Sequence, residues 1–308
     1  MLSPAADEPG PALTLRRIPD PREPAPRVAW PTVALLVVGL ALWGGSSALW
    51  LAGAWPWPLS TALNALAAYL LFTVAHEAAH HAAATDSALN RWIGRLAVPL
   101  FAPISAFPTW RFIHMQHHRF TNHADGSDPD HYTKAGPAWQ RLPRWMTIDL
   151  RYLVFYLGHR RARPRAEQRE QLAAMAALAA VTVAAVLTGH GLDVVVLLYL
   201  PSRIALVYLA WAFDYLPHHR LHHTPQSDRL KATRNRVGAE RLLTPLLLYQ
   251  NYHLVHHLHP VIPFYRYIKV WRRNEAAYLE GDPALSTVRG RALTADEYRR
   301  IRALVEHE

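Results

Sequence analysis

Apolar residues gather in four long stretches of the chain. Residues 31–51, 57–75 and 171–189 contain no Lys, Arg, Asp or Glu, and residues 192–213 contain only Asp193 and Arg203. A helix of about 20 residues crosses the ~30 Å hydrocarbon core of a bilayer. The pattern therefore predicts four transmembrane helices with these approximate bounds, joined in pairs by short turns.

The polar segments divide the rest of the chain. Residues 1–29 are rich in Pro and Arg and predict a disordered cytoplasmic tail, and residues 30–272 form one membrane domain. Residues 273–308 predict a cytoplasmic C-terminal tail with a helix, because Thr294 and Glu297 have the spacing of a capping box. Residues 141–170 mix aromatics with many arginines, which suits a helix on an anionic membrane surface.

Charge sets the expected orientation. The chain has 33 Lys+Arg and a formal net charge of +10, yet the turns near residues 52–56 and 190–191 contain no Lys or Arg. Cytoplasmic loops of membrane proteins carry the excess of basic residues. Both termini and the large central loop are therefore predicted to be cytoplasmic. This distribution indicates a membrane protein and no nucleic-acid partner.

Histidines form four clusters, and the absence of cysteine excludes thiolate-ligated metal sites. Three clusters repeat the spacing i, i+3, i+4, and a fourth is looser: His114, His117, His118; His219, His222, His223; His253, His256, His257; and His76, His80, His81. On a helix, this spacing places three rings on one narrow face. All four clusters lie on the predicted cytoplasmic side. We therefore expect one shared metal site where several helices converge.

The number of imidazoles limits the choice of metal. Imidazole is the commonest protein metal ligand, but a structural zinc takes only four ligands. Imidazole also suits iron and copper, and two metals with five or six ligands each would use the histidines available. Two irons close together can activate dioxygen, as in soluble di-iron bundles. At a membrane edge, the natural substrate of such a centre is a long apolar chain.

Three segments carry a resemblance to a known family. HEAAHH, HMQHHRFTNHADGSDPD and NYHLVHHLHP resemble the three histidine boxes of the membrane fatty acid desaturases, a family that includes bacterial carotenoid hydroxylases and ketolases. The resemblance extends from about Trp57 to Arg272. It implies an all-α integral membrane fold, in which four transmembrane helices carry a cytoplasmic helical cap with a histidine-rich di-iron site that uses O2.

The resemblance also implies a ligand set. Carried over onto this chain, the metal ligands are His76, His80, His114, His117, His118, His218, His253, His256 and His257. His218 matches a family histidine that follows an Asn by four residues, but Asp214 occupies the Asn position here and adds a negative charge. The candidates for additional ligands, or for side chains that hold the ligands in place, are His81, Asp214, His219, His222 and His223.

The resemblance gives only weak information about the substrate. An acyl-lipid (fatty acid) desaturase is the first expectation, and a carotenoid (β-carotene) hydroxylase is the alternative, because the compact length and the Tyr215–His218 stretch also fit that branch. No cysteine cluster or fused haem segment supplies electrons. We therefore expect a lipid substrate in the membrane and an external electron carrier such as ferredoxin with its reductase.

Two other classes compete with the oxygenase. His76, Glu77 and His80 form a literal H-E-x-x-H, in which Glu77 would be the general base of a zinc metalloprotease. That interpretation leaves the other clusters without a role. A metal-ion transporter would place its ligands at the bilayer midplane, whereas these stand at helix ends. Iron near two per chain supports the oxygenase, and zinc near one supports the protease.

Overall fold

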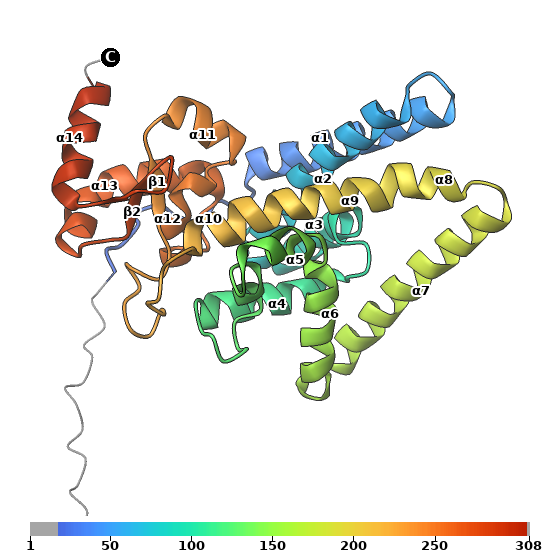
Figure 1. The fold of residues 1–308 in the computed structure, drawn as a ribbon, viewed down its shortest axis with the longest axis horizontal. Helices are drawn as coiled ribbons and strands as arrows, with labels where there is room; N and C mark the ends of the chain where they lie inside the picture. The colour runs from blue at the N-terminus through green and yellow to red at the C-terminus, as the bar shows by residue number, and fades with distance from the viewer. Residues whose placement is uncertain (1–17, 307–308) are drawn as a thin grey trace, which may run out of the picture.

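The structure is a computed structural model that describes residues 18–306, and most of it is helical (Figure 1). Within these residues, four helices are long and apolar enough to cross a membrane: α1 (Trp30–Leu51), α2 (Trp57–Ala79), α7 (Arg165–Leu187) and the continuous helix Gly191–His218. They confirm the predicted all-α, four-helix membrane architecture. On the histidine side, α2 extends past its predicted span to Ala79 and the fourth helix extends to His218, and α7 begins at Arg165, before the predicted residue 171.

Small and polar residues bring α1 and α2 together. A Cβ atom added at Gly39 would lie 2.8 Å from Cγ of Leu71, so a larger residue there would push the helices apart. The amide of Asn64 donates to the hydroxyl of Ser47 (3.2 Å) and to the carbonyl of Leu197 (3.1 Å). Close approach and interhelical hydrogen bonds are what hold helices together in lipid.

The fourth span is a composite helix. It joins α8 (Gly191–Val194), α9 (Leu200–Leu209) and α10 (Leu216–His218) through two π-helical segments, Val195–Tyr199 and Ala210–Tyr215. A π turn inserts an extra residue and is often found at functional sites. The second π segment contains Asp214, and the helix then continues to His218, so both residues stand on one rigid element.

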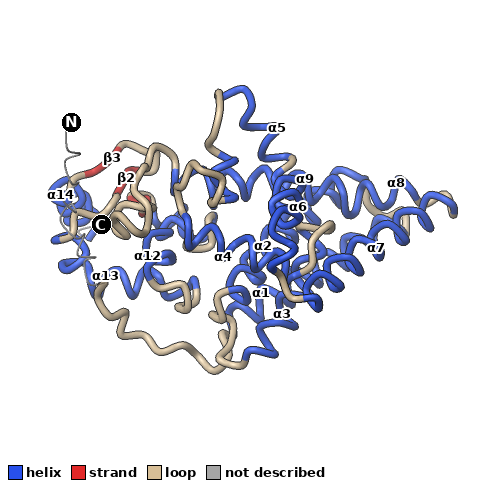
Figure 2. The backbone as a smooth tube through the Cα atoms, turned by 90° about the horizontal axis from the view of Figure 1, so that it is seen from below, coloured by secondary structure: helices blue, strands red, loops and turns tan. Residues whose placement is uncertain are grey.

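Shorter elements form the cap and the parts that support it. The helices are α3 (Ser87–Phe101), α4 (Phe107–Phe120), α5 (Arg141–Met146), α6 (Ile148–His159), α11 (Glu240–Leu246), α12 (His253–Leu258), α13 (Tyr267–Glu280) and α14 (Ala295–Glu306). Three short strands, β1 (Asn235–Val237), β2 (Leu285–Thr287) and β3 (Ala292–Leu293), form one small sheet in that order. Figure 2 shows the strands with α13 and α14 at the end of the molecule opposite the α7–α8 turn.

The sheet and the last helix tie the C-terminal segment to the cap. Strand β1 pairs with β2 in parallel, and β2 pairs with β3 antiparallel. The capping box that the sequence predicts is present: the Thr294 hydroxyl accepts from the Glu297 amide (3.2 Å), and the Glu297 carboxylate accepts from the Thr294 amide (3.0 Å). The sequence did not predict the strands, because each has only two or three residues.

The N-terminal segment differs from the expected loose tail over residues 18–29; residues 1–17 lie outside the described part of the chain. The Glu23 carboxylate is buried and forms ion pairs with Arg266, Lys269 and Arg273 on or beside α13. Ala29 donates its backbone N–H to Ala83 (2.8 Å). A carboxylate shared by three cations fixes this segment against α13.

Arg203, the charge inside the fourth span, has a specific partner. Its guanidinium donates to both carboxylate oxygens of Asp149 on α6 and to the carbonyl of Met146 (2.7 Å). Asp149 is 1% exposed. A bidentate arginine–carboxylate pair is the strongest arrangement for such groups, and it links the fourth span to the amphipathic helix α6.

Breaking this pair from the arginine side should destabilise the fold. Arg203→Met leaves the buried Asp149 without its cation and should lower the free energy of unfolding by about 3 kcal/mol. Adding Asp149→Leu removes the orphaned charge and should recover much of that loss. Thermal unfolding of the detergent-solubilised protein measures both effects, with Arg229→Met, at an exposed arginine, as the control. Equal losses in the single and double variants would contradict the coupling.

Candidate metal centre

Nine buried or half-buried histidines converge on two adjacent groups. In each group, one ring nitrogen from every histidine lies within 4.8 Å of the others. The first group contains His76, His80, His114, His118 and His256, and the second contains His117, His218, His253 and His257. These are the same nine positions that the family resemblance implies as ligands.

The repeated i, i+3, i+4 spacing divides each helix between the two groups. On α4, His114 and His118 enter the first group, and His117 enters the second. On α12, the division is reversed, because His253 and His257 enter the second group. A pair four residues apart thus serves one group while the ring between them serves the other.

The two groups are in direct contact. The rings of His118 and His257 stack with their centroids 4.2 Å apart. Within the first group, Nε2 of His80 lies 2.7 Å from Nε2 of His114. Within the second, Nε2 of His253 lies 3.0 Å from Nε2 of His257. Nitrogens this close cannot both carry protons, so at least one ring of each pair is neutral.

Outer partners occupy the other ring nitrogen of several histidines. Nδ1 of His117 lies 2.9 Å from Asp128 and 3.3 Å from Asp130, both buried. Nδ1 of His253 lies 2.7 Å from the side-chain oxygen of Gln250. A partner on Nδ1 fixes the ring and leaves Nε2 free to act as a ligand, as is usual in metal sites.

Tyr152, Gln250 and Tyr267 support the centre, although the sequence assigned them no role. Tyr152 donates to Asp130 (2.5 Å), and the Tyr267 hydroxyl lies 2.9 Å from Nδ1 of His256. Gln250 stands three residues before His253 at the start of the third box, which is the only local signal for any of the three. Tyr152 lies far from every histidine box, so no spacing rule identifies it.

Among the described residues, three ring nitrogens are both fully buried and without a hydrogen-bond partner. They are both nitrogens of His76 and Nε2 of His218. A buried polar atom without a partner costs free energy of roughly 1–3 kcal/mol. A metal ion removes that cost by accepting the nitrogen lone pair. The unpartnered nitrogens and the all-imidazole donor set therefore fit a transition metal such as iron in each group.

Electrostatics favour the neutral, ligating form of these rings. Burial, with some repulsion from neighbouring groups, lowers the pKa of six cap histidines well below the ordinary 6.5: His80, His114, His118, His253, His256 and His257. His117 is different. Burial alone would lower its pKa, but the carboxylates of Asp130 and Asp128 outweigh burial and raise it.

Glu77 does not face the two groups. Its carboxylate accepts the backbone N–H of Phe264 (3.1 Å) and is buried. His76 and His80 of the same segment turn toward three histidines from other helices. A zinc protease needs its glutamate beside the metal and the substrate. The geometry around Glu77 therefore fits a structural role and not that of a general base.

The remaining candidates lie outside both groups. His81 has a positive φ of 58° at the end of α2. The ring of His219 stacks on Tyr215 with centroids 4.4 Å apart, and His222 and His223 are exposed. The third i, i+3, i+4 cluster is not helical, because α10 ends at His218 and the chain turns there. Its spacing consequently does not place the rings on a common face.

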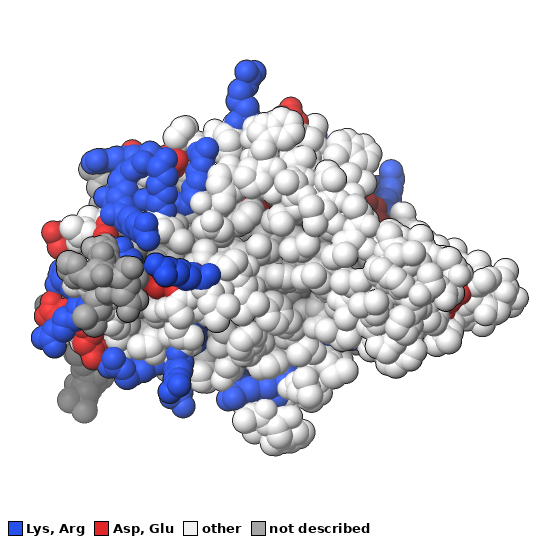
Figure 3. Space-filling view, turned by 90° about the horizontal axis from the view of Figure 1, so that it is seen from above, with Lys and Arg blue, Asp and Glu red and all other residues white. Residues whose placement is uncertain are grey.

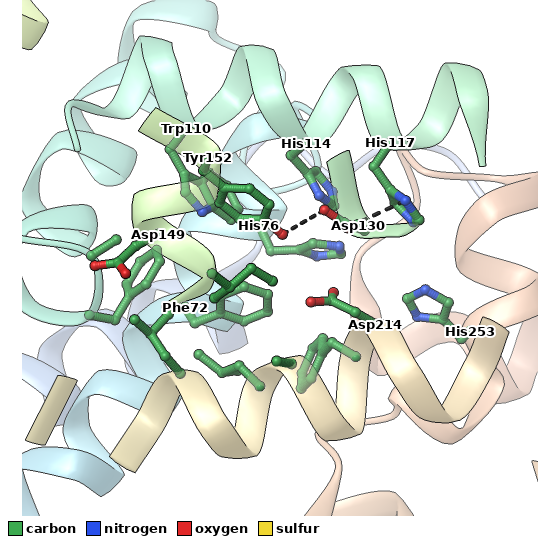
Figure 4. Close-up of a pocket in the computed structure, with 17 residues that line it drawn as sticks. Phe72, His76, Trp110, His114, His117, Asp130, Asp149, Tyr152, Asp214 and His253 are labelled. Atoms are coloured by element: carbon green, nitrogen blue, oxygen red, sulfur yellow. Dashed lines mark hydrogen bonds and ion pairs between the residues drawn. The ribbon is translucent and has the colours of Figure 1, made fainter. Parts of the chain in front are cut away.

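A narrow cavity reaches the histidines from the membrane side. Aromatic side chains from α2, α3, α4 and the fourth span line it, namely Phe72, Phe101, Trp110 and Phe213. Figure 4 shows Asp214 beside His76 and His253 at one end of this cavity. The open space is ≈ 40 Å³, enough for a few waters but not for a large substrate.

Comparisons with known proteins agree with this geometry. A sequence profile described as fatty acid desaturase matches residues 50–289. A β-carotene ketolase from Paracoccus sp. (strain N81106 / MBIC 01143) is 31% identical over 255 residues, which cover 77% of this chain and 94% of the ketolase. A second β-carotene ketolase, from Paracoccus sp. (strain PC1), is 29% identical over 197 residues, covering 64% of this chain and 71% of the ketolase.

The buried neutral histidines predict a steep dependence of stability on pH. Below the ordinary pKa of 6.5, unfolded histidines bind protons and the six buried ones do not, so stability falls as the pH falls. Each contributes up to about 1.4 kcal/mol per pH unit. Two groups oppose this trend, because each binds its proton more tightly in the folded protein: Asp130, whose pKa burial raises to about 6, and His117, whose pKa the neighbouring carboxylates raise.

Thermal unfolding of the metal-free protein in detergent, measured from pH 7.5 to pH 5, tests this dependence. We expect a steep loss of stability below pH 6.5. The double variant His222→Gln/His223→Gln is the control, because these exposed rings should leave the slope unchanged. A flat profile would show that the rings are protonated in the folded protein.

Proposed function

The chain belongs to the fatty acid desaturase family, and on that premise we propose that this multi-pass membrane oxidoreductase oxidises a methylene group of a carotenoid. The observation that carries the proposal is the similarity to two β-carotene ketolases, one of which is matched over 94% of its length. The aromatic side chains beside the histidines support an apolar substrate group at that position.

The two histidine groups would hold one iron each, five histidines around the first and four around the second. Bound iron would supply the activation of dioxygen. The protein's own groups do the rest: Asp128 and Asp130 orient His117, Tyr267 orients His256, and the aromatic walls exclude water. Asp214 adds a carboxylate beside His76 and His253, where most of the other groups are neutral.

The proposed reaction is balanced as follows. A methylene, O2, two electrons and two protons give an alcohol and water. A second round at the same carbon gives a gem-diol, which loses water to leave a ketone. Each round consumes two electrons. They must come from an external electron carrier, because the chain contains no cysteine for an iron–sulfur cluster.

An acyl-lipid desaturase, which the sequence placed first, is the second candidate. The description of the matching family profile favours it. The aromatic side chains of the cavity would suit a methylene of an acyl chain as well as one of a polyene. The two candidates differ in the fate of the substrate: desaturation removes two hydrogens and adds no oxygen.

We also propose that the cap lies in the cytoplasm and receives electrons from a small acidic carrier such as ferredoxin with its reductase. Figure 3 shows Lys and Arg gathered at the cap end, while the rest of that face is nearly free of them. The turns Ala52–Pro56 and Thr188–His190, at the other end of the spans, contain no Lys or Arg. Basic surface attracts an acidic partner and follows the positive-inside rule.

Product analysis in a host that accumulates β-carotene tests the substrate. The wild-type chain should convert the pigment to a product that has gained oxygen, with fatty acids unchanged. His117→Ala and His256→Ala remove one ligand from each group and should abolish the product, while Asp128→Asn should lower turnover about 10–100-fold. His223→Ala is the matched control. New fatty-acid double bonds with intact pigment would establish the second candidate.

Reporter fusions test the orientation. A reporter that is active only outside the cytoplasm should give a signal when it is fused after Trp55 or Gly191. A reporter that is active only in the cytoplasm should give a signal when it is fused after Ala135. The physical reason is the excess of basic residues on the cap. A cytoplasmic signal at Gly191 would contradict the proposed topology.

A further inference from the structure

A groove separate from the histidine cavity runs between α6 and α7. It has a volume of ≈ 430 Å³, within the range of about 300–1,000 Å³ that is usual for ligand pockets. One wall is formed by Leu153, Tyr156, Leu157 and Arg160. The other wall is formed by Arg165, Gln168, Arg169, Gln171, Leu172 and Met175. None of these residues lines the cavity at the histidines.

The groove follows from the periodicity of its two helices. Leu153, Tyr156, Leu157 and Arg160 have the spacing i, i+3, i+4, i+7, so they stand on one face. Residues 165, 168, 169, 172 and 175 have the same pattern on α7. The short connection after His159 makes these two faces converge, and Figure 1 shows α6 and α7 meeting at that end.

The groove is apolar in one part and positively charged at the other end. Leu157, Leu172 and Met175 are all exposed, at 49%, 69% and 38%, and give it an apolar part. Arg160, Arg165 and Arg169 stand at the other end. The apolar part continues along α7, one of the helices long and apolar enough to span the membrane. An amphipathic groove of this kind thus begins at the membrane surface and continues into the hydrocarbon.

The arginines of this groove lack acidic partners, although acids are close by. Among residues 18–306, no side chain pairs with the guanidinium groups of Arg160, Arg165 or Arg169. The two glutamates of the same stretch are engaged in bidentate pairs elsewhere: Glu167 with Arg163 (2.7 and 2.8 Å) and Glu170 with Arg95 (2.8 Å for both bonds). Three positive charges are therefore left uncompensated at one end of an apolar groove.

We propose that this groove binds one anionic phospholipid. Arg160, Arg165 and Arg169 hold the phosphate, because guanidinium groups match phosphate oxygens in bidentate geometry. An acyl chain lies along Leu157, Leu172 and Met175. The bound lipid would fill the angle between α6 and α7, where side chains of the protein leave a gap. Charge and apolar surface together select a lipid over a soluble anion.

Native mass spectrometry of the full-length protein in neutral detergent tests the proposal. Phosphatidylglycerol, phosphatidylcholine and inorganic phosphate are added in separate titrations. Phosphatidylglycerol should bind as one tight copy and clearly more tightly than phosphatidylcholine. The triple variant Arg160→Gln/Arg165→Gln/Arg169→Gln should weaken that binding by about fivefold per arginine, or roughly a hundredfold. Because the three side chains are exposed, the variant should unfold at the wild-type temperature.

Two further variants separate the groove from general electrostatics. Arg229→Gln/Arg289→Gln/Arg300→Gln removes the same charge from exposed positions elsewhere and should change the affinity by less than about twofold. Met175→Trp fills the apolar part without changing charge and should also weaken phosphatidylglycerol binding. Equal losses in the two arginine variants, equal binding of phosphatidylcholine, tight binding of inorganic phosphate alone, or an unaffected Met175→Trp variant would each overturn the proposal.

Discussion

The burial of nine imidazoles side by side is the constraint on which the rest of this structure depends. Of two rings whose nitrogens approach within 3 Å, at least one must stay neutral, and buried nitrogens need partners. The protein supplies partners on the outer side through Asp128, Gln250 and Tyr267. On the inner side, the ring nitrogens face one another in two groups whose geometry fits a metal ion. The outer hydrogen bonds hold the rings in the orientation that such an ion requires.

That requirement explains the depth at which the helices end. α2 and the fourth span both extend past their apolar stretches so that His76 and His218 reach the same layer as α4 and α12. The π segment Ala210–Tyr215 changes the register of the fourth span at that depth. The membrane helices therefore act as rigid supports of fixed length, and the cap closes over their ends.

Buried charged side chains, like buried ring nitrogens, need a partner. Deeply placed ions are paired, as Arg203 is with Asp149, because an uncompensated charge is costly away from water. At the membrane surface, the cost is lower, and Arg160, Arg165 and Arg169 remain unpaired. Near that surface some arginines have an acidic partner, as Arg163 has in Glu167, and lipid phosphate can satisfy those that have none.

The sequence by itself determined the four apolar helices and the existence of a histidine centre, because hydrophobic length and i, i+3, i+4 spacing are local properties. Local spacing could not distinguish His114, His117 and His118, which converge with other rings, from His219, His222 and His223, which do not. That difference depends on whether the backbone stays helical and which elements pack beside it. Tyr152 and the strands are likewise visible only in three dimensions. Tertiary structure alone decided how each helix divides its rings between the two histidine groups, since that division requires several helices to meet at once.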